Sequence, residues 1–200
     1  GKSTFLAVLV TKIAERLSQN GQWKKVFFFY ISFRTCSENL KSLYGIYEVF
    51  IRAIFEQARL QIPSFAPYAE KCISFFLGIP TNTSSTSFPK RIAIDKVFPY
   101  SDIRFSKLGE KIRKLFADES KVLETIDFIF NLPKQVANIF NLTDVTYVID
   151  DFDESDVDLF CRINGKDEYI LLIERFKNLL PSYSYILGCL DLPHFLNILD

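Results

Sequence analysis

Methionine is missing from this chain altogether, and histidine and tryptophan occur once each among its 200 residues. Because a natural chain normally begins with methionine, we expect the sequence to be a segment excised from a longer protein. The four cysteines lie far apart, and the single His194 cannot complete a Cys/His zinc site with them. We therefore predict free thiols in a reducing, cytoplasmic compartment.

Long apolar runs and an excess of either charge are also lacking. The longest uninterrupted apolar runs, such as 26–31, have about six residues, whereas a transmembrane helix needs roughly 20. Lys plus Arg and Asp plus Glu are balanced at 24 each, so the composition carries no electrostatic footprint for nucleic acid or anionic lipid. We expect neither nucleic acid nor a membrane as a partner.

Aromatic residues, in contrast, are abundant. Apolar residues make up 48% of the chain and 21 residues are Phe, which predicts a globular domain with a substantial core. Apolar residues recur at helical spacing over several segments. The helices expected from this spacing cover 3–19, 39–60, 68–77, 105–116, 120–131, 167–180 and 192–199, with a further helix opened by Pro133 and ending near Phe140.

Segment 25–33 lacks polar alternation and is typical of a strand buried on both faces of a parallel sheet. Segment 145–149 again has a short buried-strand pattern, 183–187 is a third strand candidate, and a Ser/Thr/Asn-rich loop is expected over 81–87. Strands that alternate with helices predict an α/β fold with a mostly parallel sheet and helices on both faces. We expect one domain over 1–200, with a largely helical insertion over 63–141.

The first four residues, Gly1-Lys2-Ser3-Thr4, directly precede the first predicted helix. They match the end of the phosphate-binding loop, in which the amino end of a helix offers free N–H groups to phosphates. Lys2 would contact the β- and γ-phosphates, Ser3 would bind Mg²⁺, and Gly1 would allow a close backbone approach. A tetrapeptide matching by chance at a helix start is the alternative.

A second motif follows the predicted strand at 145–149. Asp150-Asp151-Phe152-Asp153-Glu154 places several carboxylates at the carboxyl end of a buried strand, as a Walker B motif does. Ligands of open α/β sheets bind at that edge, and a carboxylate there can hold Mg²⁺ opposite a phosphate-binding lysine. A solvated acidic turn is the alternative interpretation of this segment alone.

Together these motifs resemble the NACHT group of STAND-class P-loop NTPases, with the fragment beginning inside Walker A. Tyr30-Ile31-Ser32-Phe33-Arg34 is similar to the strand-plus-arginine segment of those domains, which usually carry Gly where this chain has Asp151. The resemblance covers 1–34 and about 143–187. It implies a three-layer P-loop NTPase fold.

The resemblance also implies site roles. Gly1, Lys2, Ser3 and Thr4 would bind the nucleotide, Ser3 and Asp150 would bind the metal, and Arg34 would be a structural or sensing arginine. An ion pair near the sheet end is the alternative role for Arg34. The hydrolytic acids would be Asp151, Asp153 and Glu154, with Glu154 or Asp151 activating the attacking water.

The expected function is binding of ATP, favoured over GTP, with Mg²⁺. No arginine follows the strand at 183–187, where the family usually places a sensor, so we expect slow hydrolysis that drives a conformational switch or an assembly. A protein partner or self-association is expected. The alternatives are a non-hydrolysing nucleotide-binding scaffold and an AAA-related, DNA-dependent ATPase.

Overall fold

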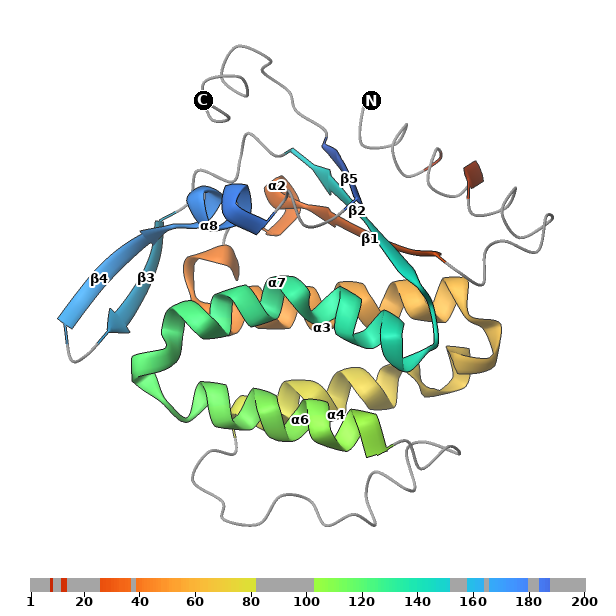
Figure 1. The fold of residues 1–200 in the computed structure, drawn as a ribbon, viewed down its shortest axis with the longest axis horizontal. Coiled ribbons are helices and arrows are strands. Elements are labelled where there is room, and N and C mark those ends of the chain that lie inside the picture. The colour runs from red at the N-terminus through yellow and green to blue at the C-terminus, as the bar shows by residue number, and fades with distance from the viewer. Residues whose placement is uncertain are drawn as a thin grey trace.

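The computed structural model describes residues 8, 12–13, 26–36, 39–81, 103–151, 158–163, 166–179 and 184–187. Within these residues the chain is mixed α/β, mostly helical, with a small parallel sheet (Figure 1). The helices are α2 Phe33–Cys36, η2 Asn39–Lys41, α3 Leu43–Gln61, η3 Pro63–Tyr68, α4 Ala69–Thr81, α6 Ile103–Phe116, η4 Glu119–Lys121, α7 Val122–Ile139 and α8 Leu172–Leu179.

The parallel sheet consists of β1 (Val26–Ser32), β2 (Asp144–Asp150) and β5 (Ser184–Leu187), in the order β1-β2-β5. All three predicted strands are thereby confirmed. The register places Ser32 opposite Asp150, so β1 and β2 end side by side at their carboxyl ends. Paired residues of β1 and β2 are 118 positions apart in sequence (144 − 26), and the chain between the two strands forms the crossover connection that parallel strands require.

Helices α3 and α7 pack against one face of the sheet, and α4 and α6 form a further layer beyond them (Figure 1). The inward residues of β1 alternate with outward ones, so every second side chain joins this core. Aromatic rings fill much of it: Phe29 of β1 contacts both Phe50 of α3 and Tyr147 of β2. The predicted helices at 39–60, 68–77 and 105–116 are confirmed, with boundary shifts of a few residues.

The opposite face of the sheet carries a smaller apolar cluster built on Phe28 and Val148. Ile13, which the structure describes as helical, packs against this cluster together with Val26, Tyr30 and Ile186. A described residue of the first predicted helix therefore lies on the face away from α3 and α7. The helical residues among 63–141 share the main core with the sheet, and their status as an insertion stays a prediction.

The outer edge of β1 is closed by two glutamines of α3. The amide of Gln57 accepts from the Tyr30 N–H at 2.7 Å and donates to the Tyr30 carbonyl at 2.6 Å. Gln61 does the same for Phe28, at 2.9 and 2.7 Å. One helical turn apart, the two side chains supply the hydrogen bonds that a further strand would otherwise make. The sheet therefore ends at β1.

A close backbone approach supports the start of α3. A Cβ atom on Gly45 would lie 1.9 Å from the carbonyl oxygen of Asn39, so this position requires glycine. The Gly45 N–H donates to the Ser42 hydroxyl at 3.0 Å, which caps the helix.

Two sequence-based predictions of local structure are wrong. Pro133 does not open a new helix, because α7 runs through it without a break from Val122 to Ile139. Proline removes one helical N–H and crowds the preceding turn at a cost of about 3 kcal/mol. The buried face of α7 offsets that cost, since Pro133 and its neighbours Leu132 and Val136 are all buried in the core.

The second wrong prediction is the helix over 167–180. Its first part is strand β4 (Lys166–Leu171), which pairs antiparallel with β3 (Asp158–Ile163), and its described helical part is α8. Helix α8 is anchored to α7 by an ion pair between Arg175 and Asp127. Phe176 of α8 packs against Phe33, which directly follows β1, and against Phe130. Segment 192–199, also predicted helical, lies outside the described residues.

Candidate functional site

Polar side chains gather where β1 and β2 end. Asp150, the last residue of β2, is 2% exposed. The hydroxyl of Tyr30 on β1 donates to its Oδ2 at 3.2 Å. The backbone N–H of Asp151 donates to its Oδ1 at 3.0 Å. The two hydrogen bonds, one from Tyr30 on β1 and one from the Asp151 backbone, therefore orient both carboxylate oxygens of Asp150.

A second chain of hydrogen bonds holds Asp151, which is 4% exposed. Ser32 donates from its hydroxyl to Oδ2 of Asp151 at 2.9 Å. The hydroxyl of Thr35 in turn donates to Ser32 at 2.9 Å. The carboxylate thus bonds to the end of the adjacent strand, and its direction is set by residues far away in sequence.

The backbone at Asp151 is left-handed, with φ of 52°. Glycine adopts this region without steric cost, whereas other residues do so rarely, and Asp and Asn more readily than most. Here an aspartate takes this turn and gains the hydrogen bond from Ser32.

Two buried carboxylates lie at adjacent positions, and among the described residues neither forms an ion pair with Lys or Arg. Burying a charge is costly unless a counter-charge or a metal compensates it. In the part of the chain that the structure describes, no group of three His, Cys, Asp or Glu side chains is placed to bind a metal ion. A metal at Asp150 would need its other ligands from elsewhere.

The phenol of Tyr30 is strongly affected by this environment. Burial first, and then the Asp150 carboxylate, raises the pKa of Tyr30 from 10.0 to about 12. Ionisation would place a phenolate beside two carboxylates, so the folded protein favours the neutral phenol. A pKa raised in the folded state stabilises the fold fully below about pH 10, and this contribution is lost as the pH rises towards 12.

We therefore expect Tyr30→Phe to reduce the loss of stability between about pH 10 and pH 12, because the ionisable group is removed. Urea unfolding at a series of pH values measures this difference. Tyr185→Phe on β5, where the native side chain is 46% exposed, is the matched control. An identical pH dependence for wild type and Tyr30→Phe would contradict the effect.

The predicted site residues are only partly within the described chain. Asp150 and Asp151 are brought together with Tyr30 and Ser32, as described above. Arg34 lies on α2 and is exposed. Gly1, Lys2, Ser3 and Thr4 lie outside the described residues, as do Asp153 and Glu154.

Sequence reasoning did not single out Tyr30 and Ser32 as site residues. Both belong to the segment Tyr30–Arg34, which the sequence indicated only as similar to the strand-plus-arginine segment of NACHT domains. Their role depends on the register between β1 and β2, which brings Ser32 opposite Asp150. One sequence signal could have identified them. Ser32 is a polar residue at the end of a predicted buried strand, and the strand predicted to lie beside it ends in acidic residues.

Comparison with protein-family models, curated protein sequences and solved structures finds no match to this chain. The resemblance to NACHT domains therefore depends on the motif residues alone. No described helix is both long and apolar enough to cross a bilayer.

Proposed function

We propose that this chain binds a nucleoside triphosphate together with Mg²⁺, at the carboxyl ends of β1, β2 and β5. The observation that carries the proposal is Asp150: a buried carboxylate, held by two hydrogen bonds, at the end of the middle strand of a parallel sheet. Open α/β sheets bind ligands at this edge. Carboxylate oxygen is a preferred Mg²⁺ ligand.

The position of Ile13 supports the proposal. It packs beside Val148 on the sheet face that also carries Tyr30. If the segment from Lys2 to Ile13 forms the expected helix, a rise of about 1.5 Å per residue would put Lys2 about 16 Å from Ile13 along the axis. In a strand rising about 3.3 Å per residue, Asp150 lies about 7 Å beyond Val148. A first helix antiparallel to the strands would therefore place Lys2 beyond the carboxyl end of β2, with room for phosphates above Asp150.

The residue roles in this proposal are assigned from the two sequence motifs. Lys2 and the amino end of the first helix, with Gly1 and Thr4, bind the phosphates, and Ser3 and Asp150 hold Mg²⁺. Arg34 directly follows the neighbouring strand β1 and acts as a structural or sensing arginine at the edge of the site. A metal held by Ser3 and Asp150 would supply neutralisation of the phosphate charge for phosphoryl transfer to water. The whole would be a three-layer P-loop domain in which ATP, rather than GTP, drives a slow switch or an assembly in the cytoplasm.

Asp151 and Glu154 have different parts in this proposal. Asp151 is buried and accepts from Ser32, so it fixes the turn that carries the acids. We assign activation of water to Glu154, with Asp153 beside it. Single-turnover hydrolysis of ATP is expected to fall by about 100-fold in Glu154→Gln, because general-base catalysis contributes about 10²–10⁴-fold.

Asp151→Asn is the matched variant for that experiment, since asparagine tolerates the left-handed turn and still accepts from Ser32. We expect it to hydrolyse ATP much faster than Glu154→Gln. Equal loss in both variants would assign the base to Asp151 instead. Binding of ATP with no turnover in the wild type would favour the non-hydrolysing scaffold.

A further inference from the structure

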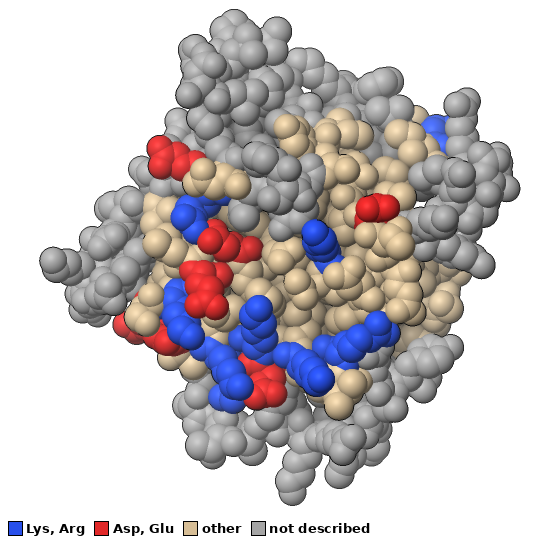
Figure 2. All heavy atoms as spheres, in the orientation of Figure 1, with Lys and Arg blue, Asp and Glu red and all other residues tan. Residues whose placement is uncertain are grey.

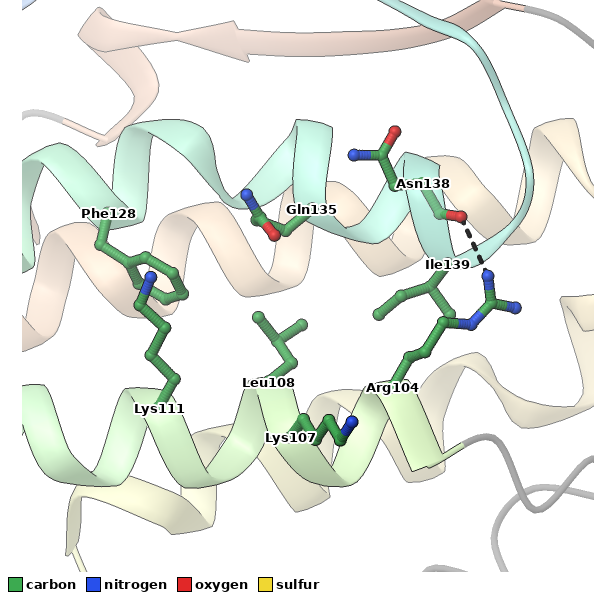
Figure 3. Close-up of a pocket in the computed structure, with 8 residues that line it drawn as sticks. All are labelled: Arg104, Lys107, Leu108, Lys111, Phe128, Gln135, Asn138 and Ile139. Carbon is green, nitrogen blue, oxygen red and sulfur yellow. Dashed lines mark hydrogen bonds between the residues drawn. The ribbon is translucent and has the colours of Figure 1, made fainter.

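A groove of about 370 Å³ lies between α6 and α7, on the layer of helices away from the sheet (Figure 3). Its floor is apolar, made by Leu108, Phe128 and Ile139, each of which is mostly buried in the core. Along α6 one side is cationic, and along α7 the other side carries amides. The groove belongs to neither the sheet edge nor the Asp150 site.

The cationic side consists of Arg104, Lys107 and Lys111, which fall on one face of α6 at spacings of three and four. Among the described residues that line the groove there is no Asp or Glu. Figure 2 shows blue side chains in a row over α6, with a red acidic side chain among them, next to the uncharged surface that leads to α7. This local charge contrasts with the neutral balance of the chain as a whole.

The three cations are not equivalent. Arg104 donates to the carbonyl of Asn138 at 3.3 Å and to the side chain of Asn141 at 3.2 Å, so it fastens the end of α7. The Lys111 ammonium lies 4.5 Å from the centre of the Phe128 ring. Lys107 is exposed, forms no ion pair with the described residues and points along the groove (Figure 3). Lys107 is therefore the cation best placed to bind an incoming anion.

The amide side is formed by Gln135 and Asn138 of α7, which face the lysines across the apolar floor (Figure 3). An amide side chain both donates and accepts, as a peptide backbone does. The groove thus presents, side by side, cations, peptide-like amides and an apolar floor. A free phosphate would use only the first of these.

We propose that this groove binds a short, extended, acidic segment of a partner protein. Carboxylates of the segment would pair with Lys107 and Lys111, its backbone would bond to Gln135 and Asn138, and an apolar side chain would lie on Leu108. Complementary charge favours such a partner over a basic or neutral one. A nucleic acid is disfavoured, because a row of three cations neutralises few phosphates.

The test uses a fluorescein-labelled peptide of alternating Glu and Leu, with fluorescence anisotropy as the readout on the full chain. We expect saturable binding that weakens with salt, and Lys107→Glu should reduce the affinity by about 10-fold through like-charge repulsion. Lys71→Glu makes the same charge change at an exposed position of α4 and should leave the affinity within about twofold. A Lys/Leu peptide should not bind.

Other outcomes would overturn the proposal. Equal affinity in Lys107→Glu and Lys71→Glu would show that the peptide binds elsewhere. If the Lys/Leu peptide bound as tightly as the Glu/Leu peptide, the groove would be a non-specific apolar surface without preference for acidic segments. Tighter binding of a mixed-sequence single-stranded oligonucleotide, lost in Lys107→Glu, would assign the groove to nucleic acid. ATP binding is not involved in any arm, so the result is independent of the proposed nucleotide site.

Discussion

Asp150→Asn is expected to lower the affinity for Mg²⁺·ATP by at least about 100-fold, since even residues that only orient a metal ligand change affinity by about 10–100-fold. Asparagine keeps the shape of the side chain: its Oδ1 can accept from the Asp151 N–H, and its NH₂ group can donate to the Tyr30 hydroxyl, so both local hydrogen bonds have a substitute. What is lost is the negative charge that binds the metal. Calorimetric titration with ATP, with and without Mg²⁺, measures the effect.

Asp144→Asn is the matched control, because it makes the same change at the opposite, exposed end of the same strand. It should bind Mg²⁺·ATP as the wild type does. Without Mg²⁺, Asp150→Asn should be at least as stable as the wild type, since one of two adjacent buried charges is gone. Unchanged Mg²⁺·ATP affinity in Asp150→Asn would exclude Asp150 as the metal ligand.

The double variant Gln57→Leu/Gln61→Leu is expected to destabilise the fold by about 2–4 kcal/mol. Leucine has similar bulk but cannot bond to the N–H and carbonyl groups of Phe28 and Tyr30, which four hydrogen bonds satisfy in the native protein. Leaving partly buried backbone groups unpaired costs about 1–3 kcal/mol each, reduced here where water replaces the glutamines. Urea unfolding measures the change in the free energy of unfolding.

The same variant should also self-associate, because an open strand edge is a template for pairing with another chain. Sedimentation velocity measures this second effect. Arg52→Leu, at an exposed position of the same helix, is the control for adding leucine to α3. If the double variant lost no more stability than Arg52→Leu and stayed monomeric to the same degree, the glutamines would not be what closes the sheet.

The strands were readable from the sequence because each is a short segment rich in β-branched and aromatic residues. The segments 25–33, 145–149 and 183–187 all have this composition, and all became strands of one sheet. The amphipathic helices were readable as well, since one apolar face must meet the core. In these segments the local pattern and the tertiary environment favour the same structure.

The hairpin of β3 and β4 was missed although a local signal was present. Asn164-Gly165 stands between the two strands, and Asn-Gly is a strong short-range sign of a hairpin turn. The apolar residues that follow, within 167–180, recur at helical spacing, and this pattern favoured a helix over the hairpin. The prediction that a helix begins at Pro133 is wrong for the opposite reason. The local preference of proline for a first helical turn favours that prediction, but packing of α7 in the core stabilises a continuous helix through Pro133.

The site was predictable only in part. The acids after Ile149 could be identified from the sequence, because several carboxylates directly follow a predicted buried strand. The support of Asp150 by Tyr30, and of Asp151 by Ser32, depends on the strand register and on a left-handed turn. The edge closure by Gln57 and Gln61 depends equally on how α3 lies along β1. Such features arise only once distant segments are packed.

The central claim is that Lys2 and Asp150 share one metal-bound triphosphate, and Mn²⁺ in place of Mg²⁺ tests it most directly. With ATP present, paramagnetic broadening of backbone NMR signals should be strongest at Lys2, Ser3, Asp150 and Asp151, and should disappear from all four in Asp150→Asn. Broadening at Asp150 without any at Lys2, or at neither, would contradict the account.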